Sequence, residues 1–416
     1  MKQLKLALGA VVVFGLMFTL GYAWRDLQTG SLPKMQAVTT LLGVTPDGRS
    51  MAPADQFQQI FRKISNDYSR PVEAKKLKYA AMGGMMASLG DPHTVFLEPK
   101  QAQEFSLETR ANFVGVGARL APDALGAKVV VVFEDGPAFK AGLKAGDTIS
   151  AVDDEACAGK EIDAIVGSIR GKEGTTVKIT VMRPNVDKPI DITCRRARIV
   201  TPTVEGRILE GEKIGYLSVA QFAEPTTEQF DKMLDRLERE GMKGLIIDLR
   251  GNPGGLLEVA KDMLSRFVER KVVVKMKGRR GAEEVVTTDS GRVRFASLPI
   301  VVLQNEESAS ASEIFAGVLQ DYRRATLVGD HSYGKASVQN VIPLIDSASV
   351  KLTIARYFLP GGRDISRKVD EDGTYVSGGL QPDVKAELGA NAEGVFGDPK
   401  TDTQLQKALE IIRGKM

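Results

Sequence analysis

The chain has 416 residues, of which 43% are hydrophobic and 26% are charged, and its formal net charge is +3. This length exceeds what one compact core holds, so two or three domains are expected, and the composition excludes a largely disordered chain. The basic residues are scattered along the chain, which argues against a nucleic-acid partner. Cys157 and Cys194 are too few for a disulfide framework, and whether they form one bridge stays open.

An uncharged run covers residues 6–24, with Lys2 and Lys5 before it and Arg25 after it. As a helix, this run is long enough to cross a bilayer core. It is longer than the apolar part of a typical signal peptide, and only residues 21–23 suggest a cleavage site. We therefore predict that residues 1–25 are an uncleaved membrane anchor; a cleaved signal and a buried core helix are the alternatives. The amino-terminal lysines then place the remaining chain outside the cytoplasm, on the far side of the inner or plasma membrane and, where there is one, in the periplasm.

Residues 26–54 mix Gly, Pro, Thr and polar residues without periodicity, which predicts a linker. Beyond them, apolar residues recur at the spacing of one helix face: Phe57, Ile60, Phe61 and Ile64. A second helix is predicted over residues 77–89, ended by Gly90-Asp91-Pro92. We interpret residues 55–111 as a helical cap or dimerisation element without a catalytic part.

Residues 112–198 predict a small β-rich domain, with strand-like runs such as 129–133 and 177–181 between glycine-containing turns. A lone Gly-x-Gly indicates no more than a tight hairpin. An ordered series of motifs nevertheless resembles a PDZ domain: Phe113-Val114-Gly115-Val116-Gly117, Gly136-Pro137-Ala138, Gly142-Leu143, Gly146-Asp147 and Ile169-Arg170-Gly171. The resemblance implies that a peptide binds by strand addition, with its terminal carboxylate held by backbone N–H groups of Gly115, Val116 and Gly117.

Residues 199–390 alternate strands and helices, which predicts an α/β core. The apolar run 244–249 is typical of a buried strand, and an amphipathic helix is predicted over residues 256–267. Residues 298–303 likewise lead into a helix over residues 312–319. The tail, residues 391–416, carries a short charged helix whose role the sequence does not indicate.

A serine-rich turn, Ser308-Ala309-Ser310-Ala311-Ser312-Glu313, lies between that last strand and helix. A serine in such a turn exposes its hydroxyl, and the free N–H groups of the helix stabilise a developing oxyanion. By spacing alone, however, ordinary helix capping explains the turn better. A histidine base would have to be His93 or His331, the only histidines in the sequence; both look structural, although neither is excluded.

The alternative base is a lysine with a neutral amine. Lys335 opens a predicted strand over residues 335–342, in which residues 335, 337 and 339 share one face. Gln339 is therefore expected to reach the lysine and to orient its amine. Without other support, a lysine at a strand start is a solvated surface charge.

The serine-rich turn, Gly334-Lys335-Ala336-Ser337-Val338-Gln339 and Asp248-Leu249-Arg250-Gly251-Asn252-Pro253-Gly254-Gly255 together resemble the carboxyl-terminal processing (tail-specific) serine peptidases of the S41 family. The resemblance covers residues 55–384. It implies a multidomain α/β protein, with a crotonase-like peptidase core and an inserted PDZ domain. It implies Ser310 as nucleophile, Lys335 as base, Gln339 as its assistant, and an oxyanion hole from the N–H groups of Ala311 and of Gly254 or Gly255. No metal or cofactor is expected.

The same resemblance implies an endopeptidase that cleaves exposed carboxyl-terminal segments of extracytoplasmic polypeptides, with a homodimer among its expected assemblies. Lys335 must then have a pKa well below its usual value of about 10.4, which burial has to supply. A bound tail is expected to shift the PDZ domain toward an active arrangement, with Arg170 contacting the core. The rival interpretations are a peptide-binding scaffold with an inactive core and a crotonase-type enzyme acting on acyl thioesters.

Overall fold

The computed structural model describes residues 52–134, 136–389 and 396–416. The predicted anchor and nearly all of the predicted linker lie outside these residues. Within the described ranges, no helix combines the length and the apolar character that crossing a membrane requires. The chain divides into two units, one ending at Ser88 and one beginning at Leu89, and the predicted cap, residues 55–111, is split between them.

The first unit contains helices α3 (Pro53–Asp67) and α4 (Ala74–Ala87), which confirms the helices expected here. Pro53 occupies the first position of α3, where a missing N–H costs no hydrogen bond. The apolar side of α3 is exposed: Phe57 is 49% exposed and Ile60 is 55% exposed.

The second unit begins with strand β1 (Val95–Leu97) and helix α5 (Pro99–Thr109). A β-rich region follows, with its elements in chain order: β2 (Asn112–Gly115), β3 (Ala118–Asp123), β4 (Gly126–Val132), α6 (Pro137–Lys140), β5 (Thr148–Val152), β6 (Glu155–Ala156), α7 (Ile162–Ile169), β7 (Thr176–Met182), β8 (Ile190–Arg195) and β9 (Ala197–Val200). Its sheet has the order β3-β4-β5-β7-β8, with β6 on β5, while β2 pairs with β9. Period-2 alternation buries Val177, Ile179 and Val181 in one core. Cys157 and Cys194 are both free and buried in this core.

The α/β region is built on a second sheet with the order β10 (Val204–Ile208), β11 (Ile214–Val219), β12 (Gly244–Asp248), β15 (Ile300–Gln304), β16 (Thr326–Gly329) and β21 (Val384–Lys385). All neighbours pair in parallel except β10 and β11. The strands are buried on both faces, which explains their continuous apolar runs. Leu245 and Ile247 of β12 join one core, and Ile246 between them joins the other.

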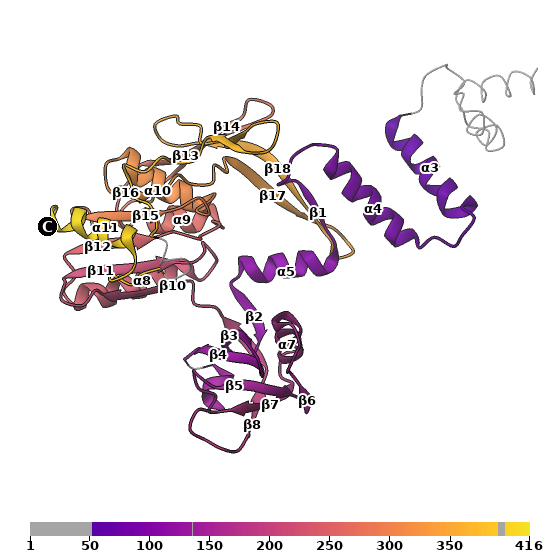
Figure 1. The fold of residues 1–416 in the computed structure, drawn as a ribbon. Coiled ribbons are helices and arrows are strands. Elements are labelled where there is room, and N and C mark those ends of the chain that lie inside the picture. Colours follow the sequence, from indigo (N-terminus) through magenta and orange to yellow (C-terminus); the bar gives the residue numbers. More distant parts are fainter. Residues whose placement is uncertain (1–51, 135, 390–395) are drawn as a thin grey trace, which may run out of the picture. The chain divides into compact units, whose positions relative to one another are not determined.

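Helices cover both faces of this sheet (Figure 1). The apolar residues of α8 (Thr226–Arg239), α9 (Leu257–Leu264) and α10 (Ala311–Asp321) pack in the core that contains Leu245. The helix α11 (Thr403–Arg413) packs in the core that contains Ile246. The strands and helices expected in this region are therefore confirmed, and α11 forms the second helical layer.

A third sheet joins segments that lie far apart in the sequence. Its strands are β1, β13 (Val272–Gly278), β14 (Glu283–Thr287), β17 (Ser337–Pro343) and β18 (Ser349–Phe358), and a separate hairpin is formed by β19 (Lys368–Val369) and β20 (Tyr375–Ser377). Because β1 pairs with β18, the segment just before α5 lies against the region that carries Lys335.

Candidate active site

Ser310 lies in the turn between β15 and α10, with φ +57° and ψ −115°. A residue with a β-carbon is strained at positive φ, and such strain is concentrated at functional sites. The backbone N–H of Ser310 donates to Glu313 Oε2 at 2.8 Å, so the expected capping interaction is present. The capping role and a chemical role of this turn are therefore compatible.

A second loop, residues 249–255, is joined to the serine turn by several hydrogen bonds. Ser308 Oγ donates to the Leu249 carbonyl at 2.8 Å. The Asn252 carbonyl accepts from Ala309 N and from Ser312 Oγ, both at 3.0 Å. Ser308 and Ser312, on either side of Ser310, thus hold the two loops together.

Gly254 of this second loop packs directly against the nucleophile turn, and Gly255 packs against Phe222. A β-carbon on Gly254, whose φ is +98°, would lie 2.5 Å from the Ala309 carbonyl oxygen and 2.9 Å from Ala311 N. A β-carbon on Gly255, at φ +141°, would lie 2.1 Å from the Phe222 carbonyl oxygen. Only glycine fits at both positions.

The two glycines differ in their hydrogen bonds. The N–H of Gly254 donates to Asn252 Oδ1 at 2.9 Å. In the described part of the chain, the N–H groups of Gly255 and Ala311 have no protein acceptor. Of the two glycines, only Gly255 therefore keeps a free N–H, as does Ala311, the residue after Ser310. The sequence alone could not decide between Gly254 and Gly255.

Glu313 joins the nucleophile turn to the segment that carries Lys335. Its side chain is fully buried and accepts four hydrogen bonds: from Ser310 N at 2.8 Å, Ser332 Oγ at 2.5 Å, Gly334 N at 2.6 Å and Lys335 N at 2.9 Å. Burial raises the pKa of this carboxyl, and the hydrogen bonds counteract it. The sequence indicated only a capping residue here, because the partners near position 334 are distant along the chain.

Lys335 is partly buried and lies just before β17. Burial lowers the pKa of its amine and the nearby Lys351 cation lowers it further, whereas Glu313 and Asp91 oppose the shift. No carboxylate of the described residues lies within ion-pair distance of this amine. Ser310 Oγ and Lys335 Nζ are not hydrogen-bonded to each other in this arrangement, although Tyr357 Oη donates to the carbonyl oxygens of both residues, at 3.4 Å and 2.7 Å.

Gln339 lies on β17, on the same side of the strand as Ser337, as the alternation predicts. The register of β17 against β18 shifts between Val338 and Gln339, and the extra residue, Ile354, lies on β18. The Gln339 amide donates to Ser337 Oγ at 2.7 Å and to Thr353 Oγ1 at 3.3 Å.

The turn around His93 lies beside these strands, a placement that the sequence did not indicate. Thr94 Oγ1 donates to Asp91 Oδ2 at 2.7 Å and accepts from Thr353 N at 3.0 Å. Burial and then the charge of Lys335 lower the pKa of His93. His331, in contrast, stacks on Tyr375 with ring centroids 4.0 Å apart, and its Nδ1 lies 3.0 Å from the Ser332 carbonyl.

Comparison with known proteins agrees with this arrangement. Residues 213–386 match the model of Peptidase family S41, and residues 112–194 match that of the PDZ domain. The chain is 33% identical over 373 residues to the carboxy-terminal processing protease CtpB of Bacillus subtilis, covering 87% of this chain and 76% of that protein. It is 34% identical over 390 residues to the carboxy-terminal-processing protease of Bartonella bacilliformis, covering 87% and 88%. The chain belongs to the S41 carboxy-terminal processing proteases.

As a member of this family, the S41 peptidase described here is a serine protease. A putative S41 protease from Bacteroides fragilis shares the fold, with a TM-score of 0.51 and 17% identity over 84% of this chain and 92% of that chain. The predicted fold class, an α/β peptidase core with a PDZ domain, is confirmed.

The PDZ domain of this S41 peptidase has an edge strand next to the predicted carboxylate loop. Strand β3 ends the sheet and follows directly on Gly115, Val116 and Gly117, of which Gly117 has φ +84°. Arg170 caps the carboxyl end of α7, and its guanidinium lies over the Phe113 ring at 5.3 Å. A cavity of about 860 Å³ elsewhere in this region is lined mainly by residues 195–200 and by residues near α6, and it includes none of the predicted site residues.

Proposed function

We propose that the chain is an endopeptidase that cleaves exposed carboxyl-terminal segments with Ser310 as nucleophile and Lys335 as general base. One observation carries this proposal: the backbone N–H groups of Ser310 and Lys335 bind the same oxygen of Glu313, at 2.8 Å and 2.9 Å. The buried Glu313 carboxylate therefore keeps the two residues adjacent. Burial lowers the pKa of Lys335, the direction that a neutral general base requires.

The proposed chemistry follows from these positions. The neutral Lys335 amine takes the proton of Ser310 Oγ as that oxygen attacks the scissile carbonyl. The N–H groups of Ala311 and Gly255 bind the resulting oxyanion. Lys335 then gives the proton to the leaving amine, and water, deprotonated by the same lysine, releases the acyl group from Ser310. Gln339 assists by orienting the lysine once its amide turns from Ser337.

Recognition of the substrate tail is assigned to the PDZ domain. A peptide adds as a strand to the β3 edge, and its terminal carboxylate binds at Gly115, Val116 and Gly117. Because Ser310 and Lys335 are adjacent but not hydrogen-bonded, a closing step on peptide binding fits the arrangement. Arg170 is the proposed link between the bound peptide and the core; if Arg170→Ala leaves stimulation by an added tail peptide unchanged, this link is wrong.

The proposal is tested by incubating the purified protein with an unfolded protein substrate and reading the new carboxyl ends by mass spectrometry. Wild type and His93→Gln should cleave, whereas Ser310→Ala and Lys335→Ala should not. Cleavage by Ser310→Ala at the wild-type rate would overturn the proposal. Turnover of an acyl thioester without protein cleavage would favour the acyl-transfer rival, and peptide binding without either activity would favour the scaffold.

We also propose that the body of the protein acts outside the cytoplasm, held by the anchor predicted in residues 1–25. The charge pattern of Lys2, Lys5 and Arg25 around an uncharged run supports this location. An externally added protease should digest the catalytic body in spheroplasts that remain intact. Protection of that body until lysis would contradict the location.

Homodimer formation through the first unit is a further proposal, supported by the exposed apolar side of α3. Ile60→Glu should then lower the mass measured by sedimentation, while Gln58→Glu, a change at an exposed polar position of the same helix, should not. An unchanged mass for Ile60→Glu would contradict this assembly.

A further inference from the structure

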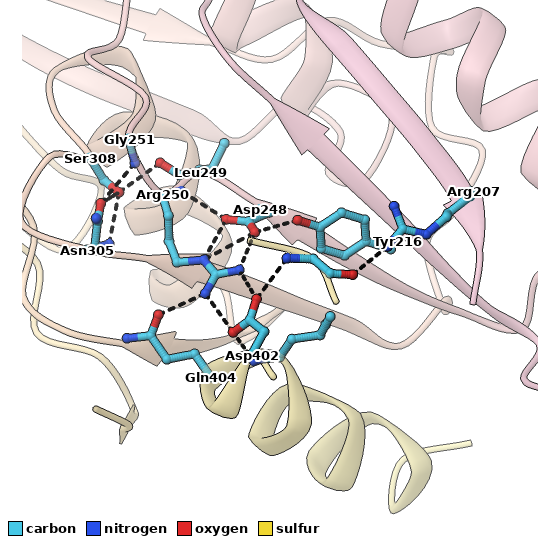
Figure 2. A network of polar contacts seen from close by, with 12 residues as sticks. Arg207, Tyr216, Asp248, Leu249, Arg250, Gly251, Asn305, Ser308, Asp402 and Gln404 are labelled. Atoms are coloured by element: carbon cyan, nitrogen blue, oxygen red, sulfur yellow. Dashed lines mark hydrogen bonds and ion pairs between the residues drawn. The ribbon is translucent and has the colours of Figure 1, made fainter. Parts of the chain in front are cut away.

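Arg250, in the loop that carries the glycine pair, lies in a buried network with the carboxyl-terminal segment (Figure 2). The side chains of Arg250 and Asp402 are both fully buried. The guanidinium donates to the two Asp402 oxygens at 2.9 Å and 2.7 Å, and to Gln404 Oε1 at 2.9 Å. It also donates to Asp248 Oδ2 at 2.5 Å. One side chain thus joins the strand β12, the loop after it and the start of α11.

The partners of Arg250 are themselves held by other hydrogen bonds. Tyr216 Oη donates to Asp248 Oδ2 at 2.7 Å. Asp402 accepts from the backbone N–H groups of Gly397 and Leu405, at 2.9 Å and 3.0 Å. Burial raises the pKa of Asp402, but Arg250 and these donors outweigh it, so the pKa lies below its usual value. A bidentate, fully hydrogen-bonded ion pair of this kind has one defined geometry.

The segment that supplies Asp402 is anchored independently. Leu405, Leu409 and Ile412 of α11 are buried against the face of the sheet that contains Ile246 and Val301. The Phe396 ring lies over the guanidinium, 4.2 Å from its carbon. Apolar packing of α11 therefore fixes the position of Asp402, and the ion pair with Asp402 fixes the position of the Arg250 side chain.

The neighbours of Arg250 along the chain contact the nucleophile turn. The N–H of Gly251 donates to Asn305 Oδ1 at 3.0 Å, and the Leu249 carbonyl accepts from Ser308 Oγ, as Figure 2 shows. Further along the same loop, Gly254 packs against Ser310, and Gly255 with its free N–H follows directly. A displacement of Arg250 would therefore move the loop that supplies an oxyanion donor.

We infer that the carboxyl-terminal segment, residues 396–413, is a positioning element of the active site, in which Asp402 holds Arg250 and so fixes the loop of Gly255. This inference rests on the proposed function, since it assigns the oxyanion hole to Gly255 and Ala311. Asp402 touches no substrate in this scheme and acts through Arg250.

The test is Asp402→Asn, which keeps the shape of the side chain but removes its charge. The kcat for a tail peptide should fall by at least about tenfold. Complete loss of an oxyanion donor lowers kcat by roughly 10²–10³, and a displaced donor should lose part of that factor. KM should stay within about twofold, since uniform substrate binding is untouched. A peptide aldehyde, whose adduct with Ser310 places an oxyanion in the same hole, should bind at least about tenfold more weakly.

The matched control is Lys407→Gln, a change on the same helix at a surface ion pair with Glu410, which should leave all three quantities unchanged. If Asp402→Asn is too unstable to study, Gln404→Ala removes a neutral partner of Arg250 and should lower kcat several-fold at constant KM. Wild-type kcat and aldehyde affinity in the variant, with only a lower Tm, would overturn the inference. The proposed function would survive that result, because its own tests are the loss of cleavage in Ser310→Ala and Lys335→Ala.

Discussion

Arg250 and Lys335 are two cations withdrawn from water in the same peptidase core, and their surroundings are opposite. Arg250 is fully buried, and carboxylates on both sides and further hydrogen bonds raise its pKa despite burial. Lys335 is partly buried without an ion-pair partner among the described residues, and burial lowers its pKa. Burial alone therefore lowers the pKa of a cation and favours its neutral form, and buried carboxylates reverse this effect. The surroundings of Arg250 suit it to hold segments of the fold together, and those of Lys335 suit it to act as a base.

The largest effect expected from this comparison concerns the chemistry at position 335. Lys335→Arg should lower kcat by roughly 10²–10⁴, as should Lys335→Met, because a guanidinium keeps its proton and cannot act as base. Initial rates of tail-peptide cleavage measure this effect, with His93→Gln expected near the wild-type rate. A Lys335→Arg enzyme within tenfold of wild type would show that position 335 is not the base.

For stability the order is the opposite: replacing Arg250 should lower the free energy of unfolding more than replacing Lys335. Arg250→Met leaves Asp248 and Asp402 buried beside each other without a countercharge, so the free energy of unfolding should fall by about 3–5 kcal/mol. Lys335→Met removes a partly buried cation without a carboxylate partner, so it should cost little or be stabilising. Urea unfolding of both variants measures the difference. Equal losses would mean that the two sites do not differ as described.

The dependence of kcat on pH tests the surroundings of Lys335. The enzyme should gain activity as pH rises through the Lys335 pKa, since only the neutral amine accepts the serine proton. The Lys351 cation lowers that pKa, whereas Glu313 and Asp91 raise it. Lys351→Gln should therefore move the rising limb of kcat against pH to higher pH and lower the rate several-fold on that limb. A limb that stays in place or moves to lower pH would contradict this effect.

The smallest expected effect is the acid sensitivity of the Arg250 network. The folded pKa of Asp402 is depressed, so its contribution to stability is complete above the unfolded value of about 3.9 and is lost as pH falls through the folded value. Asp402→Asn should be less stable than wild type at neutral pH, and the gap should narrow in acid. Urea midpoints of both proteins at neutral pH and near pH 3 measure the gap. A gap of constant size would exclude this carboxyl as the titrating group.

Local patterns predicted much of the architecture. The apolar run at residues 244–249 and the helix after the serine turn lie where periodicity placed them, as β12 and α10. The motif around Ser310 and the segment of Lys335 also meet in space, through Glu313. Such features depend on side chains close together in the sequence, or on motifs long enough to identify a family.

The features that the sequence patterns did not predict depend on contacts between distant segments of the chain. Ser337 and Gln339 share one side of β17, as strand alternation predicts, but the contact of Gln339 with Thr353 arises from pairing with β18. The Asp91 to Thr94 turn was grouped with the helical cap, yet it binds Thr353.

The amino-acid sequence by itself determined the order of strands and helices, the peptidase and PDZ motifs and the residues proposed for chemistry, because these follow from local periodicity and short motifs. Only the tertiary structure decided which glycine N–H is free, that Glu313 joins the serine turn to the lysine segment, and that a tail helix of unassigned role supplies Asp402 to Arg250. The physical reason is that hydrogen bonds and burial depend on distances between atoms, and those distances exist only once the chain is folded.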